Sequence, residues 1–151
     1  MIKVICIGKL KEKYLKDAVE EYLKRLSKYT KVNLIELNDV NNTDVNNILK
    51  KEQEDISKYI EPKDYVITLE IEGVQINSIE LAKKIENIFL NYSNITFVIG
   101  GSHGLSDEIK NRANYKLSFS RLTFPHQLFR VMLLEQIYRV FKINNNEEYH
   151  K

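Results

Sequence analysis

The stretch Phe97–Glu108, FVIGGSHGLSDE, places a glycine cluster between an apolar run and the acidic start of a helix. Phe97–Ile99 has the composition of a buried strand, and Asp107 and Glu108 are residues favoured in a first helical turn. Many nucleotide-binding loops begin in this way. A strand–loop–helix unit of this kind predicts an α/β protein whose glycine loop lies at the carboxyl end of a strand.

The glycine loop does not fit the common phosphate-binding motifs. A P-loop has Lys and then Ser or Thr after its last glycine, whereas Gly104 is followed by Leu105 and Ser106. The dinucleotide fingerprint follows a first strand, and there this chain has only Gly8. Ser106 can cap the helix, and the acids of its first turn repel a phosphate. Two readings stay open: a loop that presents bare backbone to a weakly charged or cationic ligand, and a plain connection whose glycines serve its geometry.

Strand and helix signals alternate in both directions from this loop. We expect strands at 2–8, 32–37, 64–70, 94–99 and 115–119, and helices at 11–29, 43–59 (capped by Thr43 or Asp44), 78–91 (capped by Ser78), 107–113 and 125–141. Gly73 is expected in a turn after the third strand. The pattern predicts a mostly parallel sheet with helices on both faces in one domain spanning residues 1–151. By itself it favours a flavodoxin-like fold.

Composition and length narrow the function classes. The net charge of +2 neither supports nor excludes an RNA partner. Cys6 is the single cysteine, so an intrachain disulfide is impossible. His103, His126 and His150 lack metal-ligand spacing and predict no metal site. No apolar run has the length of a signal peptide or a membrane span, so we expect a cytoplasmic protein without membrane contact.

The last expected helix is apolar over more than one face. A helix that covers a sheet needs one apolar stripe, so this helix is buried on two sides or faces a partner subunit. Homodimerisation is the simplest account, and a fully internal helix is the alternative. Glu135 and Arg139 are one turn apart and can pair, while Arg130 and Arg139 can equally point into a site.

Three connections and the carboxyl-terminal tail are candidate ligand contacts. Leu69, Gly100 and Phe119 close the third, fourth and fifth expected strands, and sheets of this class bind ligands beyond such ends. The segment Phe119–His126 is apolar enough to line a flat pocket or to fold onto the core. So close to the chain end, His150 is by default solvated and without a role. The alternative is that the tail Tyr149–Lys151, which joins an aromatic ring, an imidazole and a cation, stacks on and hydrogen-bonds a nucleobase.

These segments together resemble the ribosomal large-subunit pseudouridine N3-methyltransferases, which are small members of the SPOUT superfamily. The resemblance covers essentially the whole chain. It is carried by Glu21–Arg25, Val98–Gly101 with Gly104–Ser106, Leu117–Ser120 with Leu122–His126, Arg130, Glu135–Arg139 and Tyr149–Lys151. One departure is the segment Asn146–Tyr149, which lacks the proline often found there in the family and implies a more mobile tail.

The resemblance implies an S-adenosylmethionine-dependent enzyme with a SPOUT-type trefoil knot in the carboxyl-terminal part of the sheet. The implied substrate is N3 of a pseudouridine in 23S rRNA, within the assembled large subunit or 70S ribosome. A homodimer is implied because so small a chain must borrow docking surface from the ribosome and from a second subunit. The family's cofactor contacts fall on Leu69, Gly100, Phe119, Ser120, Arg121, Leu122, Thr123 and Phe124, and no role falls on His103.

Methylation at N3 requires that its proton be removed. Under the resemblance, His126 or His150 is the base or proton relay, and Arg139 or Arg130 stabilises the developing anion. Tyr149 stacks on the nucleobase, in its own or in a partner's site. Two alternatives remain: a SPOUT methyltransferase acting on tRNA, and a noncatalytic flavodoxin-like binding module.

Overall fold

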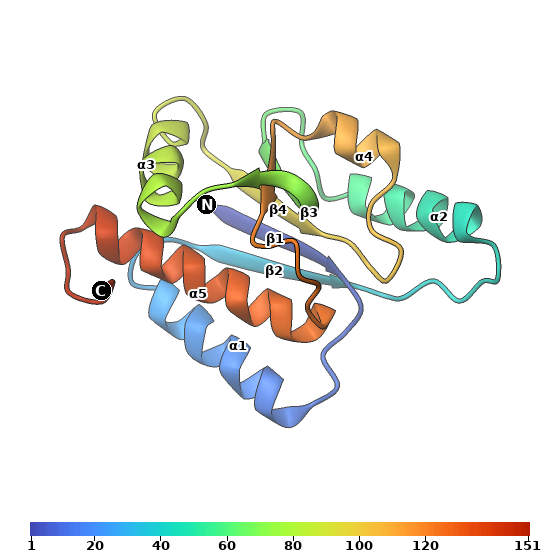
Figure 1. The fold of residues 1–151 in the computed structure, drawn as a ribbon, viewed down its shortest axis with the longest axis horizontal. Helices are drawn as coiled ribbons and strands as arrows, with labels where there is room; N and C mark the ends of the chain where they lie inside the picture. Colours follow the sequence, from blue (N-terminus) through green and yellow to red (C-terminus); the bar gives the residue numbers. More distant parts are fainter.

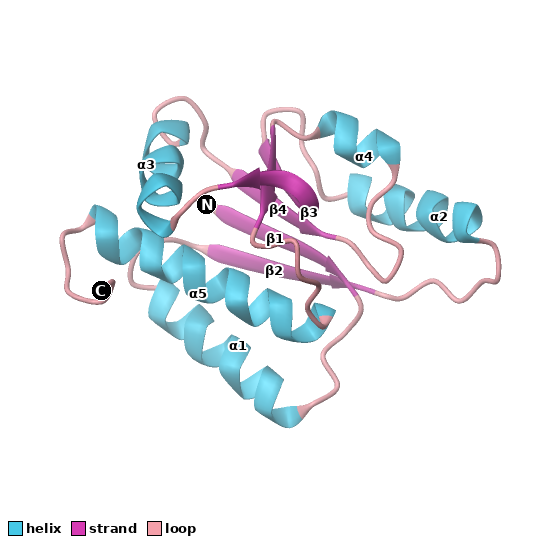
Figure 2. Cartoon of the chain, viewed as in Figure 1, coloured by secondary structure: helices cyan, strands magenta, loops and turns pink.

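Five strands and five helices alternate along the chain, as the sequence periodicity predicts (Figures 1 and 2). The computed structural model describes all residues, 1–151. The elements in chain order are β1 (Ile2–Ile7), α1 (Lys13–Leu26), β2 (Val32–Leu37), α2 (Val45–Ser57), β3 (Tyr65–Gln75), α3 (Ser78–Ile88), β4 (Ile95–Ile99), α4 (Asp107–Arg112), β5 (Tyr115–Ser118) and α5 (His126–Asn144).

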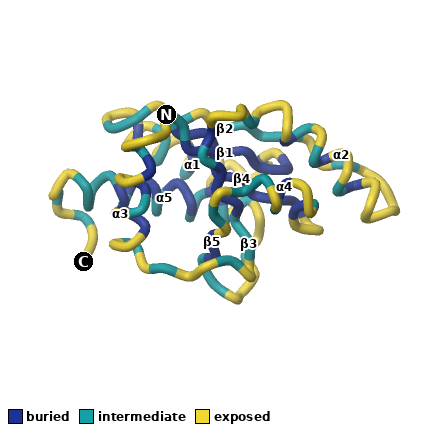
Figure 3. Tube along the Cα trace, turned by 90° about the horizontal axis from the view of Figure 1, so that it is seen from above, coloured by how far each residue is buried: buried dark blue, intermediate teal, exposed yellow.

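The central strands are buried on both faces, because alternate side chains enter two separate cores. Val4 and Cys6 of β1 belong to a 21-residue apolar cluster that is completed by α1, α3 and α5. Ile5 and Ile7 belong to a 7-residue cluster completed by α2 and α4. Buried residues accordingly concentrate in β1 and β4 (dark blue in Figure 3). The prediction of helices on both faces is confirmed.

All strand pairs are parallel, and the order across the sheet is β2-β1-β4-β3-β5. A flavodoxin-like sheet has the order 2-1-3-4-5, so the fold that the pattern alone favoured is wrong: β3 and β4 exchange places. Periodicity identifies strands but carries no information on which neighbours pair. The order is compatible with the knot that the resemblance implies, and the knot itself stays a prediction.

The third strand corrects the expectation of a turn at Gly73. Strand β3 continues to Gln75, and its pairing with β5 shifts register between Leu69 and Val74. An ideal Cβ at Gly73 would lie 2.8 Å from the backbone carbon and oxygen of Lys116. The glycine therefore permits a close approach of two strand backbones, which a sequence pattern cannot distinguish from a turn.

Two helix caps are also resolved. Asp44 caps α2 by accepting a hydrogen bond from the Asn46 amide at 2.9 Å, which confirms one of the two expected capping residues. The cap of α3 is Asn77 rather than Ser78, because Asn77 and Glu80 form a reciprocal capping box. Ser78 is the first helical residue, and its hydroxyl donates instead to Gln136 of α5 at 2.7 Å.

Helix α5 lies between α1 and α3 on one face of the sheet (Figure 1). Its buried residues are Arg130, Leu133, Leu134, Ile137, Tyr138 and Val140, which cover more than one helical face. Burial on two sides within one chain therefore accounts for much of the apolar character of this helix. The apolar character of α5 is therefore not by itself evidence for a homodimer.

A buried ion pair lies near the amino-terminal ends of β1 and β3. Lys3 of β1 contacts Asp64, which directly precedes β3, at 2.6 Å, and both side chains are less than a tenth exposed. Asp64 also accepts hydrogen bonds from the Thr96 hydroxyl and the Glu61 amide, each at 3.0 Å. Burial pushes the pKa of Asp64 up, but the hydrogen bonds from Lys3, the Glu61 amide and Thr96 outweigh it and hold the pKa below its usual range.

Candidate functional site

A cavity of about 830 Å³ opens at the carboxyl ends of β3, β4 and β5. We call it the strand-end pocket. Leu69 closes one wall, Gly100 and Gly104 form the second, and the β5–α5 connection forms the third. The sequence analysis identified these same three strand ends. A pocket at this edge is what the general rule for ligand sites in open α/β sheets predicts.

The glycine loop is shaped by backbone contact. An ideal Cβ at Gly100 would lie 2.5 Å from the carbonyl oxygen of Gly104, so the two peptide backbones touch at a distance no side chain permits. Gly101 and Gly104 form an isolated antiparallel bridge, and Gly104 has a φ of +76°. Ser106 caps α4 by accepting from the Ile109 amide at 3.3 Å, as expected. The loop thus presents main chain to the pocket.

The connection from β5 to α5 is held by hydroxyls and stacked rings. The Ser120 hydroxyl accepts from the Leu122 amide at 3.0 Å. The Phe129 ring lies 4.9 Å from that of Phe119 and 5.9 Å from that of Phe124, measured between centroids. The loop therefore folds its phenyl rings onto α5 and leaves Leu122 exposed at the pocket mouth.

The strand-end pocket also carries negative charge that the sequence analysis did not assign. Glu70 and Glu72 line it together with one cation, Lys110. The Thr68 hydroxyl donates to the Glu70 carboxylate at 2.6 Å and fixes its direction, while the Lys110 ammonium lies 4.0 Å away. The sequence did contain a signal for these acids: they follow Leu69, the residue at which the core-facing part of β3 ends.

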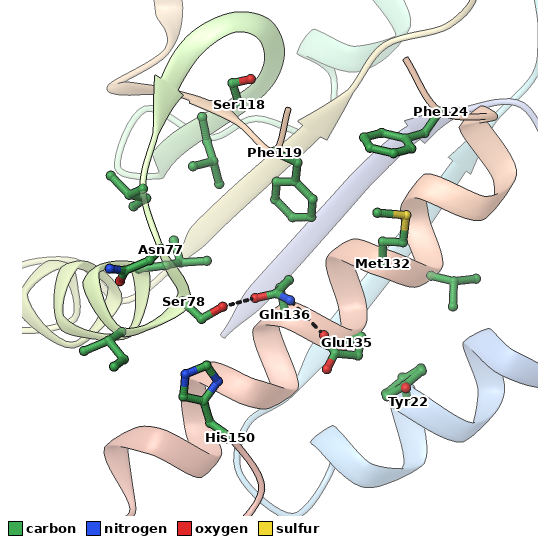
Figure 4. A pocket seen from close by; sticks show the side chains of 15 residues that line it. Tyr22, Asn77, Ser78, Ser118, Phe119, Phe124, Met132, Glu135, Gln136 and His150 are labelled. Atoms are coloured by element: carbon green, nitrogen blue, oxygen red, sulfur yellow. Dashed lines mark hydrogen bonds between the residues drawn. The ribbon is translucent and has the colours of Figure 1, made fainter. Parts of the chain in front are cut away.

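A second cavity, of about 760 Å³, lies between β5, α3 and α5, with Tyr22 of α1 at its rim (Figure 4). We call it the tail pocket because His150 of the carboxyl-terminal tail lines it. Phe119 and Phe124 line both cavities, so the two pockets share a wall. Gln136 accepts from Ser78 and donates to Glu135 at 3.0 Å, which ties α3 to α5 across the floor.

Glu135 organises the tail beside this pocket. Its carboxylate accepts from Arg139 Nε at 3.0 Å, from Arg139 Nη2, and from the Tyr149 hydroxyl at 3.2 Å. The guanidinium lies 4.8 Å from the centre of the Tyr149 ring. Burial, followed by the charge of Glu135, raises the pKa of Tyr149 to about 12, so its hydroxyl stays a donor.

The remaining contact of Arg139 determines what His150 can do. Arg139 Nη1 lies 3.1 Å from His150 Nδ1. A guanidinium carries only donors, so Nδ1 accepts and the proton of the neutral ring resides on Nε2. In this arrangement His150 offers an N–H donor, not a lone pair, to a group in the tail pocket.

The structure brings most of the expected residues together, in two groups. Seven of the eight expected cofactor contacts line the strand-end pocket, as does His126; Arg121 is exposed and does not. His150, held by Arg139 and Tyr149, lines the tail pocket. The two catalytic histidine candidates therefore belong to neighbouring cavities.

One arginine candidate lies in the protein core. The Arg130 side chain is 1% exposed, pairs with Glu36 and lies 3.4 Å from the Ile7 carbonyl oxygen. Because its guanidinium is buried and already paired, the structure gives no support to the hypothesis that Arg130 stabilises an anion in the site. Its role is to fix the amino-terminal end of α5 to the ends of β1 and β2.

No group of three or more His, Cys, Asp and Glu residues is arranged to hold a metal ion. No helix is both long and apolar enough to cross a bilayer.

Comparisons with known proteins give a consistent result. The family model described as "Predicted SPOUT methyltransferase" matches residues 1–150. The chain is 55% identical to the ribosomal RNA large subunit methyltransferase H of Clostridium novyi (strain NT) and 53% identical to that of Clostridium botulinum (strain Alaska E43 / Type E3). Each alignment spans 157 positions and 99% of both chains.

A solved structure supports the fold. The chain superposes on a probable methylase family protein from Haemophilus influenzae Rd KW20 with a TM-score of 0.56, over 99% of this chain and 70% of that one. The two sequences are 16% identical, so this likeness concerns the fold alone. With a family match over residues 1–150, the chain belongs to the SPOUT methyltransferase family.

Proposed function

We propose that this protein is a cytoplasmic, S-adenosylmethionine-dependent methyltransferase that acts on N3 of a pseudouridine in 23S rRNA of the assembled large subunit or 70S ribosome. Residues 1–151 act as one methyltransferase domain. The observation that carries the proposal is a pocket built from three strand ends beside a second pocket that holds the tail histidine. The names of the Clostridium relatives support a ribosomal RNA substrate.

The strand-end pocket fits S-adenosylmethionine in three respects. Leu69, Phe119 and Phe124 supply apolar surface for an adenine ring, and the glycine loop supplies main-chain polar groups. Glu70 and Glu72 favour the positive charge of the sulfonium. The backbone contact at Gly100 leaves no room for a side chain in the cradle. When bound there, the cofactor supplies an electrophilic methyl group.

Residues of the chain itself are proposed to accept the proton, stabilise the anion and hold the base. The methylated nitrogen must lose its proton, and His126 is the candidate acceptor or relay because it lies exposed at the mouth of the strand-end pocket. His150 and Arg139 act as donors to the carbonyl oxygens of the base and stabilise its anion. Tyr149 stacks on the nucleobase once the tail adjusts, since its ring now packs edge-on against Tyr138 at 4.9 Å.

The active form is proposed to be a homodimer. Exposed apolar side chains border both pockets: Leu122 is 71% exposed, Ile79 58% and Ile71 49%. Such residues beside an open cavity favour cover by another protein surface. A second copy would exclude water from the reacting base and bring another tail near each strand-end pocket.

The experiment that tests the proposed function follows radiolabelled methyl groups. The purified protein is incubated with labelled S-adenosylmethionine and either 70S ribosomes lacking the modification or bulk tRNA. We expect label in 23S rRNA and none in tRNA. Label in tRNA would instead establish the tRNA-directed alternative, and no label with no cofactor binding would leave the noncatalytic module.

A further inference from the structure

A third hollow lies at the opposite end of the sheet from the strand-end pocket. It measures about 670 Å³ and is open, and it is bounded by Tyr65, Tyr92 and Tyr115 and by the outer face of α3. Tyr65 and Tyr115 are the first residues of β3 and β5, so the hollow sits at the amino ends of these strands. Neither the proposed catalysis nor cofactor binding uses it.

The tyrosines of this hollow form one cluster. The Tyr65 and Tyr92 rings meet edge to face with centroids 5.1 Å apart, and Tyr92 remains 36% exposed. Burial and the neighbouring phenols of Tyr92 and Tyr115 raise the pKa of Tyr65. The Tyr92 ring is thus braced by Tyr65 and still partly accessible, and an accessible aromatic ring held in place by its neighbours can act as a stacking platform.

Two lysines place positive charge at the same hollow. The Lys84 ammonium lies 3.8 Å from the centre of the Tyr115 ring, and Lys83 is exposed beside it. The acid of this face, Glu80, is engaged in the capping box of α3, where it accepts from the Asn77 amide at 3.1 Å. Asn87 and Asn91 add amide groups able to hydrogen-bond a base edge.

We propose that this hollow, defined by Tyr65, Tyr92, Tyr115, Lys83 and Lys84, docks an unpaired nucleotide of the ribosomal RNA while the target base occupies the active site. The lysines contact phosphates and Tyr92 stacks on the base. The proposal rests on the proposed function and adds a ribosome contact to it. Its placement fits, because Ile76 lines both this hollow and the tail pocket. A chain with a net charge of +2 needs such a local patch to hold RNA.

The test compares matched variants on 70S ribosomes. Lys83→Ala/Lys84→Ala removes two charges from the hollow, and Lys16→Ala/Lys50→Ala removes two from exposed positions of α1 and α2. For the hollow variant we expect ribosome affinity to fall about tenfold near physiological salt, and the slope of log affinity against log salt to flatten by about 1.4, or about 0.7 per phosphate contact. The control variant keeps wild-type values.

A second pair separates stacking from folding. Tyr92→Leu should weaken ribosome binding about tenfold, while Tyr92→Phe, which keeps a ring, should stay within about twofold of wild type. All variants should bind S-adenosylmethionine and melt as the wild type does. Unchanged ribosome affinity and salt slope in the hollow variants would overturn the docking site, provided wild-type protein methylates ribosomes. Failure of the wild type to methylate any ribosome would overturn the proposed function instead.

Discussion

Substitution of Gly100 tests whether the strand-end pocket holds the cofactor through its glycine loop. In Gly100→Ala the new Cβ would lie 2.5 Å from the Gly104 carbonyl oxygen, 0.9 Å short of the 3.4 Å at which ordinary contacts begin. Overlap of this kind with backbone costs about 1–3 kcal/mol. If the loop moves to relieve it, affinity for S-adenosylmethionine falls by a corresponding factor, about 5- to 150-fold.

Calorimetric titration with S-adenosylmethionine and thermal denaturation together measure this cost. If the loop does not move, the same free energy lowers the melting temperature by roughly 2–4 °C per kcal/mol. Gly104→Ala is the matched control, because no atom lies within 4 Å of its Cβ position and only its φ of +76° is strained. The reasoning is refuted if Gly100→Ala retains both wild-type affinity and melting temperature, or if Gly104→Ala loses more affinity than Gly100→Ala.

Three further predictions concern the rest of the chain. Arg130→Ala should lower the free energy of unfolding by about 1–3 kcal/mol in denaturant titrations, since it leaves Glu36, whose side chain is 30% exposed, without its charged partner; an unchanged free energy of unfolding would contradict the pairing. Asp64 has a lowered pKa, so its stabilisation is complete above the pKa of the unfolded chain, about 4, and is lost as the pH falls through the folded value. Wild-type protein should therefore lose its stability advantage over Asp64→Asn at acid pH, and a constant difference from pH 7 to pH 2 would exclude this linkage. Glu135→Gln, which weakens the hold on Arg139 and Tyr149, should lower kcat on ribosomes at least tenfold with unchanged affinity for S-adenosylmethionine; equal losses in both would indicate a folding defect.

The helices and strands could be predicted from the sequence because a buried face requires apolar residues at a regular spacing. Every residue of β1 is buried, and its apolar run, interrupted only by the ion-paired Lys3, is typical of a strand covered on both faces. The capping residues Asp44 and Ser106 could also be identified, because capping depends only on a local side chain that accepts from the first amides of the helix. Strand order was not accessible, because β3 and β4 have equivalent patterns and differ only in their neighbours.

The location of the site residues could be predicted from the sequence more readily than their chemical roles. The strand ends at Leu69 and Gly100 could be read from where apolar runs stop, whereas the separation of His126 from His150 depends on how α5 and the tail fold back. Arg130 and Arg139 look alike in sequence. The packing of α5 buries the first and leaves the second beside the tail pocket, held by Glu135.

The central claim is methyl transfer to one atom of one ribosomal nucleoside. Its most direct test is mass spectrometry of nucleosides from 23S rRNA, after incubation of unmodified 70S ribosomes with the protein and S-adenosylmethionine that carries a deuterated methyl group. The account predicts a single labelled product, pseudouridine methylated at N3. Label on another nucleoside, or no labelled nucleoside, would contradict it.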